Sequence, residues 1–196
     1  MPTIVIATTN RHKARELRGL LAAREIRWRT LSDYPRLRPV RETGKTFEAN
    51  AVKKAVAVAK AVGMMALADD SGLEVEALGW GPGVRSARFA GAHGNDGANN
   101  RKLLRLLRGL PRRKRRARYQ CALALASPSG VIAVAHGTWT GRIAEQPAGR
   151  GGFGYDPLFV IPRLGKTVGE LPASVKRHFS HRARAARRLY RALTRL

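Results

Sequence analysis

The sequence predicts an α/β fold with a mixed sheet, because segments typical of strands and of helices alternate along the chain and one pair of strands is joined by a tight turn. The chain opens with a β-branched run, Thr3–Thr8, and continues with leucines at helical spacing within His12–Ala23. Later, two apolar segments, Arg118–Ala126 and Val131–Thr140, flank Ser127–Gly130, a turn sequence typical of a hairpin. A strand–turn–helix opening and an antiparallel hairpin in one chain indicate a mixed sheet.

The other elements can be assigned from apolar spacing and from Gly, Pro and capping residues. Thr46–Val62 carries an inner stripe that includes Phe47 and Ala51 and is followed by Gly63, as expected of a long helix. Met64–Ala68 is a compact apolar strand that ends before two aspartates. We expect further strands at Trp28–Asp33 and Leu158–Ile161, helices from Asn95 or Asp96 to about Arg108 and from His181 (capped by Ser180) to about Thr194, and loops over Tyr34–Val40, Gly79–Gly91 and Gly149–Pro162.

Size and composition predict one packed domain. The chain has 196 residues and 44% hydrophobic content, which is enough for a real core. The longest apolar runs, such as Ile4–Ala7 and Ala122–Ala126, are too short to span a bilayer, and the N-terminal stretch has no signal-peptide pattern. The single cysteine, Cys121, cannot form an internal disulfide and lies in an apolar alternation. We therefore expect a cytoplasmic protein with no membrane partner.

The net charge of +25 predicts a polyanionic partner, either a small polyphosphate or a nucleic acid. The densest basic cluster, Pro111–Arg118, lies between an expected helix and an expected strand. A solvated connector is the simplest interpretation of this cluster, and contact with nucleic acid is the alternative. Few aromatic residues lie near it to stack on bases, so we expect weak nonspecific binding and no specific nucleic-acid site.

A first place for chemistry is the polar turn Thr8–Lys13, between the first strand and the first helix. The N–H groups at a helix start, together with Lys13, favour a bound phosphate. The glycines of a Walker A loop are missing, and the turn could equally be a plain helix cap.

A second place is the pair Asp69-Asp70 after the apolar strand. Two adjacent carboxylates are costly unless a cation lies beside them, and Mg²⁺ is the usual cation where the substrate is a polyphosphate. Glu42 is a candidate for a further oxygen ligand. The structural alternatives are an Asx-turn before Ser71 for the aspartates and an ordinary surface position for Glu42.

A third place combines the aromatic turn Gly152–Pro157 with Lys176 and with Ser180–Arg182. Glycines on both sides of Phe153 let a flat ligand approach its ring, and Asp156 can accept hydrogen bonds from ring N–H groups. His181 and Arg182 can donate to a carbonyl. An aromatic turn, a capping serine and a solvated arginine are the alternatives for the separate pieces.

In this order, these segments resemble the ITPase family, also called the Ham1-like family of inosine and xanthosine triphosphate pyrophosphatases. The resemblance runs from Ile4 to about Leu189. Each motif alone is weak, but six in register are specific. The family's T-x-N-x-x-K, E-T-G-x-T-F-x-x-N-A, A-D-D-S-G-L, P-G-x-x-S-A-R-[FY]-x-G, G-G-F-G-Y-D-P-x-F and K-x-x-x-S-H-R appear at Thr8–Lys13, Glu42–Ala51, Ala68–Leu73, Pro82–Gly91, Gly151–Phe159 and Lys176–Arg182.

The resemblance implies a single ITPase-like domain, residues 1–196, with two lobes on a long mixed sheet flanked by helices and an active-site cleft between the lobes. It also implies a homodimer and Mg²⁺. It places the metal on Glu42 and Asp70, with Asp69 nearby, and makes Asp70 the proposed general base. Triphosphate binding falls on Thr8, Thr9, Asn10, Arg11, His12, Lys13 and Lys54, and base recognition on Ser71, Phe153, Gly154, Tyr155, Asp156, Lys176, His181 and Arg182.

The activity implied by the resemblance is hydrolysis of deaminated purine nucleoside triphosphates (ITP, dITP and XTP) to the monophosphate and pyrophosphate, which keeps these nucleotides out of DNA and RNA. The sequence departs from the family at Thr9 and Trp80, where glycine is common, and at Arg177, where asparagine is frequent. Two other functions remain alternatives. One is a pyrophosphatase acting on modified pyrimidine nucleotides, and the other is a nucleic-acid-binding protein suggested by charge alone.

Overall fold

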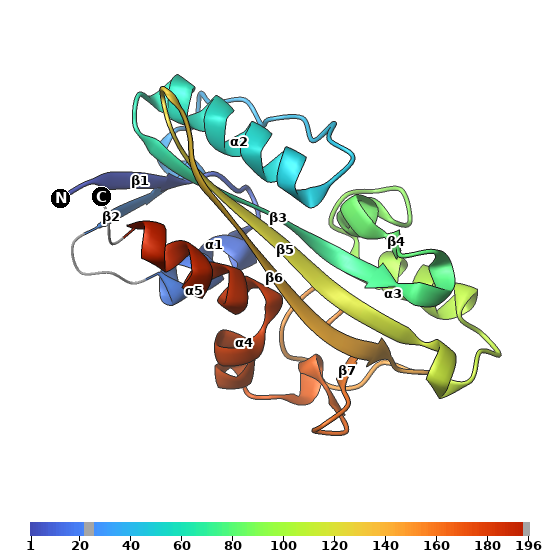
Figure 1. Cartoon of the computed structure of the whole chain (residues 1–196). Helices are drawn as coiled ribbons and strands as arrows, with labels where there is room; N and C mark the ends of the chain where they lie inside the picture. Colours follow the sequence, from blue (N-terminus) through green and yellow to red (C-terminus); the bar gives the residue numbers. More distant parts are fainter. Residues whose placement is uncertain (22–25, 194–196) are drawn as a thin grey trace. The chain divides into compact units, whose positions relative to one another are not determined.

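The computed structural model describes residues 1–21 and 26–193 and shows a mixed α/β fold, as the sequence predicts (Figure 1). One sheet runs in the order β2-β1-β3-β5-β6-β7-β8, and β4 pairs with β3. Strand β1 is parallel to β2 and β3, whereas β7 is antiparallel to β6 and β8. The strands are β1 (Thr3–Ile6), β2 (Arg27–Thr30), β3 (Met65–Val75), β4 (Gly81–Pro82), β5 (Arg116–Ser127), β6 (Gly130–Ile143), β7 (Phe159–Ile161) and β8 (Lys166–Thr167).

The helices follow the sequence patterns closely. They are α1 (Arg11–Leu20), α2 (Phe47–Val62), α3 (Asp96–Leu106), α4 (Ala173–Phe179) and α5 (His181–Leu193). No helix in residues 1–21 and 26–193 is long and apolar enough to cross a membrane. The predicted helix ends at Ala23 and Thr194 lie outside the described residues.

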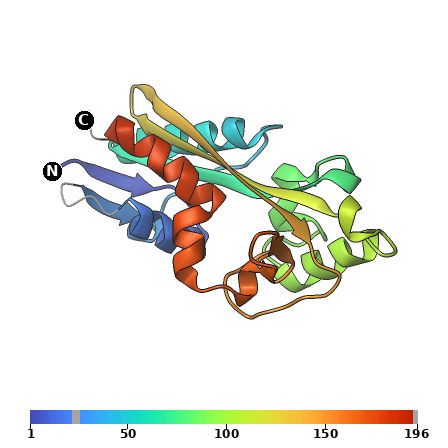
Figure 2. The same cartoon turned by 60° about the horizontal axis from the view of Figure 1, so that its bottom comes forward.

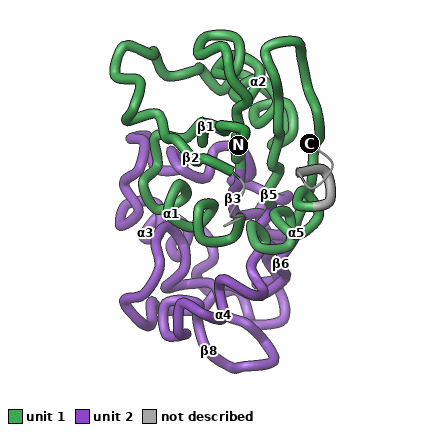
Figure 3. Tube along the Cα trace, turned by 90° about the vertical axis from the view of Figure 1, so that its left-hand side faces the viewer, with its two compact units in different colours: residues 1–70, 121–137, 181–196 green, residues 71–120, 138–180 purple. Residues whose placement is uncertain are grey.

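The chain divides into two compact units (Figure 3). Unit 1 comprises Met1–Asp70, Cys121–Gly137 and His181–Leu196, and unit 2 comprises Ser71–Gln120 and Thr138–Ser180. The boundary falls within β3, β5 and β6, so each of these strands contributes residues to both units.

In unit 1, the two faces of the sheet have different cores because successive strand residues point to opposite sides. On one face, Ile4, Ile6 and Leu67 pack with residues of α1 and α5 such as Leu17 and Leu189. The other face is built largely from alanines and valines of β1, β3 and β5, and α2 covers it with Ala51, Ala55, Val58 and Ala59 (Figure 1). Small side chains on both surfaces leave α2 close to the sheet.

Local signals fix the ends of the unit 1 helices. The side chain of Asn10 accepts hydrogen bonds from the backbone N–H groups of His12 and Lys13 and caps α1. Thr46 caps α2 in the same way, and Gly63 ends it with a φ of 66°, a left-handed conformation that suits glycine. These boundaries agree with the sequence predictions.

Unit 2 has a core of its own on the distal parts of the long strands. Leu73 and Val75 of β3 pack with Leu103 and Leu107 near the end of α3, and the rings of Tyr119 and Phe159 lie 4.4 Å apart. The predicted hairpin is present, since β5 and β6 are neighbours separated by two residues. In Figure 2, the segment from β7 through α4 can be followed up to the start of α5.

One prediction about the sheet is wrong. The sequence places Asp69-Asp70 directly after a strand that ends at Ala68, but β3 continues without a break to Val75. Both aspartates are buried within the strand, with 0% and 5% of their surface exposed. The Asx-turn is excluded for the same reason, because extended backbone runs through Ser71 and Gly72.

Smaller differences concern element ends. The strand predicted over Trp28–Asp33 is shorter, since Leu31–Asp33 forms a 3-10 turn. Helix α4 was not predicted from the sequence, and it places Lys176 in its last turn. Ser180 lies in extended conformation between α4 and α5.

Candidate functional site

Asp69 is the centre of a buried ion-pair network in unit 1. Its Oδ1 lies 2.6 Å from Lys13 Nζ of α1, and its Oδ2 accepts a hydrogen bond of 2.9 Å from Arg182 Nε of α5. Cys121 Sγ donates to the same Oδ2 at 3.2 Å. Burial alone would raise the pKa of Asp69, but Arg182 and Lys13 outweigh it and hold that pKa well below its usual range. Asp69 is therefore a permanent anion that orders two cations.

Asp70 points to the opposite face of β3, as the strand period requires, and meets α2. Its Oδ2 accepts a hydrogen bond of 3.0 Å from Asn50 Nδ2, and Lys54 Nζ lies 3.8 Å from its Oδ1. Burial raises the pKa of Asp70 to about 6, against the opposing effect of Lys54 and Lys13. Adjacent carboxylates thus have opposite pKa shifts because different helices face them.

Glu42 joins Asp70 through a shared ammonium. Lys54 Nζ donates to Glu42 Oε1 and also to the backbone carbonyl of Asp69, the latter at 2.7 Å. The segment before α2 is held in place by Asn50, whose Oδ1 accepts from Gly44 N at 2.7 Å. A Cβ on Gly44 would lie 2.8 Å from that oxygen, so the site needs glycine there.

The donor set at Glu42 and Asp70 fits Mg²⁺. Two carboxylates converge on one ammonium, and burial raises the pKa of Asp70 in spite of Lys54 and Lys13, so a further cation there would favour its charged form. Within the described ranges no cluster of three or more His, Cys, Asp or Glu residues could hold a metal. Two carboxylates are nevertheless enough, because Mg²⁺ keeps several waters and completes its shell with substrate phosphates.

The turn Thr8–Lys13 lies in the same unit and carries polar side chains at the start of α1. Thr8 Oγ1 accepts from Asn10 N at 3.2 Å, and the two N–H groups that Asn10 caps are already hydrogen-bonded within the turn. Lys13 pairs with Asp69. Of the residues predicted to bind triphosphate, Thr9, Asn10, Arg11 and His12 are exposed, while Lys54 is part of the Glu42–Asp70 arrangement.

His181 and Arg182, predicted to read the base, are buried at the start of α5 in unit 1, with 4% and 1% of their surfaces exposed. Arg182 donates from Nε to Asp69 and from Nη1 to Glu16 of α1. The structure therefore gives Arg182 two carboxylate partners within unit 1, and base contact by either residue stays a prediction.

In unit 2, Asp156 organises the aromatic turn that the sequence predicts to hold the base. Its Oδ1 accepts from Tyr119 Oη at 3.1 Å, and its Oδ2 accepts from the backbone N–H of Phe153 at 2.9 Å and from Lys176 Nζ at 2.5 Å. Lys176 Nζ also lies 4.1 Å from the centre of the Phe153 ring. Phe153 is half-buried, and the ammonium lies close to its ring, so an aromatic surface and a positive charge stand side by side.

The same turn is held by two other elements of unit 2, α3 and the 3-10 segment Gly83–Arg88. Gly154 N donates to Asp96 Oδ2 at 2.7 Å, and Asn100 Nδ2 donates to Gly154 O at 3.1 Å, both from α3. Tyr155 Oη donates to the carbonyl of Ser86 at 2.8 Å. Gly152 has a φ of 76°, and a Cβ there would lie 2.0 Å from Asp156 Oδ2.

The predicted residues thus fall into two groups. Unit 1 brings together Glu42, Lys54, Asp70 and, through Asp69, Lys13 and Arg182. Unit 2 brings together Phe153, Asp156 and Lys176, and Gly154 and Tyr155 lie in the same turn. Ser71 directly follows Asp70 in β3 and belongs to unit 2.

The model of the Ham1 family matches residues 4–192 of the chain. The chain belongs to the Ham1 family. A dITP/XTP pyrophosphatase of Geobacillus kaustophilus is 50% identical over 96% of this chain and 93% of its own length, and one of Listeria monocytogenes serovar 1/2a is 47% identical over 98% and 95%. Among solved structures, a HAM1 protein from Coxiella burnetii matches with a TM-score of 0.90 and 38% identity over 100% of both chains. The Staphylococcus aureus Ham1 protein matches with a TM-score of 0.87 and 40% identity over 98% of both.

Within this Ham1 chain, several supporting residues were not singled out from the sequence. Asn50, which orients Asp70, stands in the motif Glu42–Ala51, and its position beside the Asp70 carboxylate is visible only in three dimensions. Tyr119 belongs to an apolar strand pattern and gave no separate signal. Asn100 lies within a helix, where an amide usually faces solvent.

Proposed function

We propose that this chain hydrolyses deaminated purine nucleoside triphosphates, namely ITP, dITP and XTP, to the monophosphate and pyrophosphate. The observation that carries the proposal is the meeting of Glu42 and Asp70 at the ammonium of Lys54 in unit 1. Membership of the Ham1 family and the names of the similar curated proteins support it. Removing these nucleotides would keep them out of DNA and RNA.

We infer that Glu42 and Asp70 hold Mg²⁺ when substrate is present. The bound ion would withdraw charge from the phosphates and favour departure of pyrophosphate. Lys54 Nζ, which the two carboxylates share, would then be released to contact a phosphate oxygen. Asn50 holds Oδ2 of Asp70 at 3.0 Å and so fixes the carboxylate plane.

Asp70 is suited to accept a proton from the attacking water or to orient that water. Without a bound metal ion, the pKa of Asp70 is about 6, which is close to the range where a carboxylate serves as a general base near neutral pH. Asp69 is unsuited to this role, because Arg182 and Lys13 hold it as an anion and occupy its oxygens.

For the base, the half-buried Phe153 ring offers a stacking surface and Lys176 offers a donor for a 6-keto oxygen. Hypoxanthine and xanthine carry this oxygen, whereas adenine carries an amino group that would face a cation. A mismatched polar group of this kind can discriminate by about 10⁴-fold. Guanine shares the oxygen, so its rejection must depend on its 2-amino group.

The decisive experiment measures pyrophosphate release from dITP, XTP, dATP and dGTP, each with Mg²⁺ and with EDTA. We expect rapid release from dITP and XTP that requires Mg²⁺. Equal rates on all four substrates would contradict the base selectivity, and full activity in EDTA would contradict the metal. Preference for a modified pyrimidine triphosphate in the same panel would support the alternative pyrophosphatase.

Two further properties are part of the proposal: a homodimer, which the family resemblance implies, and a cytoplasmic location, which the composition and the short apolar runs predict. Sedimentation analysis of the purified chain tests the first, because a dimer has twice the monomer mass of 21.5 kDa. Fractionation of cells that produce the untagged chain tests the second.

A further inference from the structure

A hollow in unit 1 extends from the predicted triphosphate turn over residues of α1 that have no role in the proposed hydrolysis, Arg15 and Arg18. Its volume is about 720 Å³, within the range of roughly 300–1,000 Å³ that is usual for small-molecule sites. One wall is α1, and the other is the segment after β2. The lining residues are Thr8, Thr9, Arg11, Ala14, Arg15, Arg18, Thr30, Leu31, Ser32, Tyr34, Pro35, Leu37 and Pro39.

The α1 wall carries a row of cations. Arg11, Arg15 and Arg18 are spaced four and three residues apart, which places them on one face of the helix. All three are exposed, and none forms an ion pair with a carboxylate of the described residues. Glu16 on the same helix turns instead toward Arg182. The row is therefore available to an external anion.

The opposite wall adds hydroxyl groups and, among the described residues, no carboxylate lines the hollow. Thr30 Oγ1 and Ser32 Oγ lie 2.6 Å apart on this wall. Asp33, the nearest acidic residue in sequence, accepts a hydrogen bond of 2.8 Å from the backbone N–H of Thr30. A compact anion in this hollow would meet guanidinium and hydroxyl donors without a facing negative charge.

The hollow adjoins the predicted triphosphate turn. A smaller hollow of about 70 Å³ contains Glu42 and Lys54 and shares lining residues with the larger one. The shared residues are Thr8, Thr9, Leu31, Leu37 and Pro39. The Thr8-Thr9 turn thus lines both hollows. Glu42 lines the smaller hollow, and the arginine row lines the larger one.

We propose that the larger hollow binds inorganic pyrophosphate, with Arg15 and Arg18 as its principal ligands, and receives this product after cleavage; the second half of this proposal rests on the proposed function. Pyrophosphate is small and multiply charged, and guanidinium groups bind its oxygens in pairs. The hollow offers no carboxylate for a ribose hydroxyl among its described lining residues, so it suits the inorganic product better than the nucleotide.

The test is calorimetric titration of sodium pyrophosphate into the full chain in EDTA. EDTA removes any divalent ion that Glu42 and Asp70 would hold, and the difference between the wild-type chain and the arginine variants reports on the arginine row. R15Q/R18Q should weaken binding by at least about tenfold, because charge-assisted hydrogen bonds to the anion are lost. The control R112Q/R113Q removes the same charge from exposed positions in unit 2 and should change the affinity by less than about twofold.

Glutamine preserves helix propensity, so both variants should fold, and circular dichroism checks this. Equal weakening in the two variants, or unchanged affinity in R15Q/R18Q, would overturn the proposal, as would absence of binding to the wild-type chain. Turnover of dITP is assayed separately, so a chain that binds pyrophosphate through Arg15 and Arg18 but releases none from dITP would refute the proposed function alone. If the wild-type chain is active, pyrophosphate should inhibit the dITP turnover of R15Q/R18Q more weakly than that of R112Q/R113Q.

Discussion

Each unit contains a buried aspartate, and the groups that contact its carboxylate differ between the two units. In unit 1, Asp69 is balanced by full charges from two helices, Lys13 and Arg182, at 2.6 and 2.9 Å. In unit 2, Asp156 is balanced by one ammonium, from Lys176, together with a phenol and a backbone N–H group. Both arrangements link elements that are distant in the sequence, but the first pairs a strand carboxylate with two helix cations, whereas the second also fixes the turn around Phe153.

This difference indicates what each unit can do. The ion pairs of Asp69 hold fixed charges next to Asp70. Burial raises the pKa of Asp70 to about 6. The hydrogen bonds of Asp156 hold the Phe153 turn in place, and the side chain of Lys176 stays partly exposed to a ligand. Chemistry is thus expected to depend on unit 1 and selectivity on unit 2.

The largest effect is expected from Asp69→Asn. Loss of this charge removes the carboxylate that pairs with partly buried Lys13 and one of the two carboxylates that pair with buried Arg182, and breaking a buried ion pair costs roughly 3–5 kcal/mol of unfolding free energy. Asp156→Asn should cost less, about 1–3 kcal/mol, because two of its three donors are uncharged. Urea unfolding of both variants measures the two values, and an equal loss would break the comparison.

Asp70→Asn should reduce the turnover of dITP by at least about a hundredfold while leaving the fold intact. Asparagine preserves the shape of the side chain but removes the proton acceptor and the charge for Mg²⁺. The matched control is Glu48→Gln, an exposed carboxylate on the same helix as Lys54, which should retain wild-type turnover. A near-normal rate in Asp70→Asn would remove Asp70 from the chemistry.

Gly152→Ala should disturb the Phe153 turn, because the new Cβ would lie 2.0 Å from Asp156 Oδ2 in a backbone with a φ of 76°. Gly154→Ala is the control, since its φ of 65° imposes similar strain of roughly 1–2 kcal/mol but nothing lies within 4 Å of the Cβ. We expect a rise in KM for dITP of about tenfold or more in Gly152→Ala beyond that in Gly154→Ala, about 1.4 kcal/mol of binding. Identical KM values would show that Asp156 does not position the ring.

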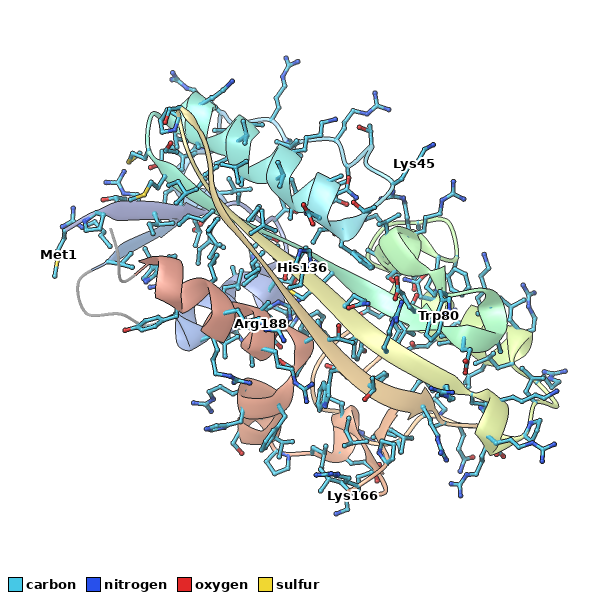
Figure 4. The ribbon with its side chains drawn as sticks, in the orientation of Figure 1. Met1, Lys45, Trp80, His136, Lys166 and Arg188 are labelled. Atoms are coloured by element: carbon cyan, nitrogen blue, oxygen red, sulfur yellow. The ribbon has the colours of Figure 1, made fainter. Side chains whose placement is uncertain are left out.

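The smallest effect is expected from Trp80→Gly. Trp80, labelled in Figure 4, has a φ of 66°, and its ring lies 4.1 Å from the guanidinium of Arg118. Glycine would relieve strain of about 1 kcal/mol and lose a cation–π contact of similar size. The two effects should cancel to within about 0.5 kcal/mol in thermal or urea unfolding, and a loss above about 1.5 kcal/mol would show a larger structural role for Trp80.

Much of the fold could be predicted from local patterns. Helix α2 was located from its apolar stripe and from Gly63, and the β5–β6 hairpin from its turn residues. Helix α4 was missed because its seven residues carry too short a pattern to reveal a period. The sequence singled out the candidate site residues, but their hydrogen-bond partners, such as Asn50 and Tyr119, depend on packing between elements.

The sequence by itself determined the family motifs, the buried β-branched run of β1 and the caps at Asn10 and Thr46, because these depend on neighbours within a few residues. Only the tertiary structure decided that Asp69-Asp70 lie within a buried strand. Two polar residues in a row are typical of a turn, and they remain in a buried strand only because Lys13, Lys54 and Arg182 reach them from three helices. Charges that distant in the chain can stabilise the strand only after the sheet and its helices have come together.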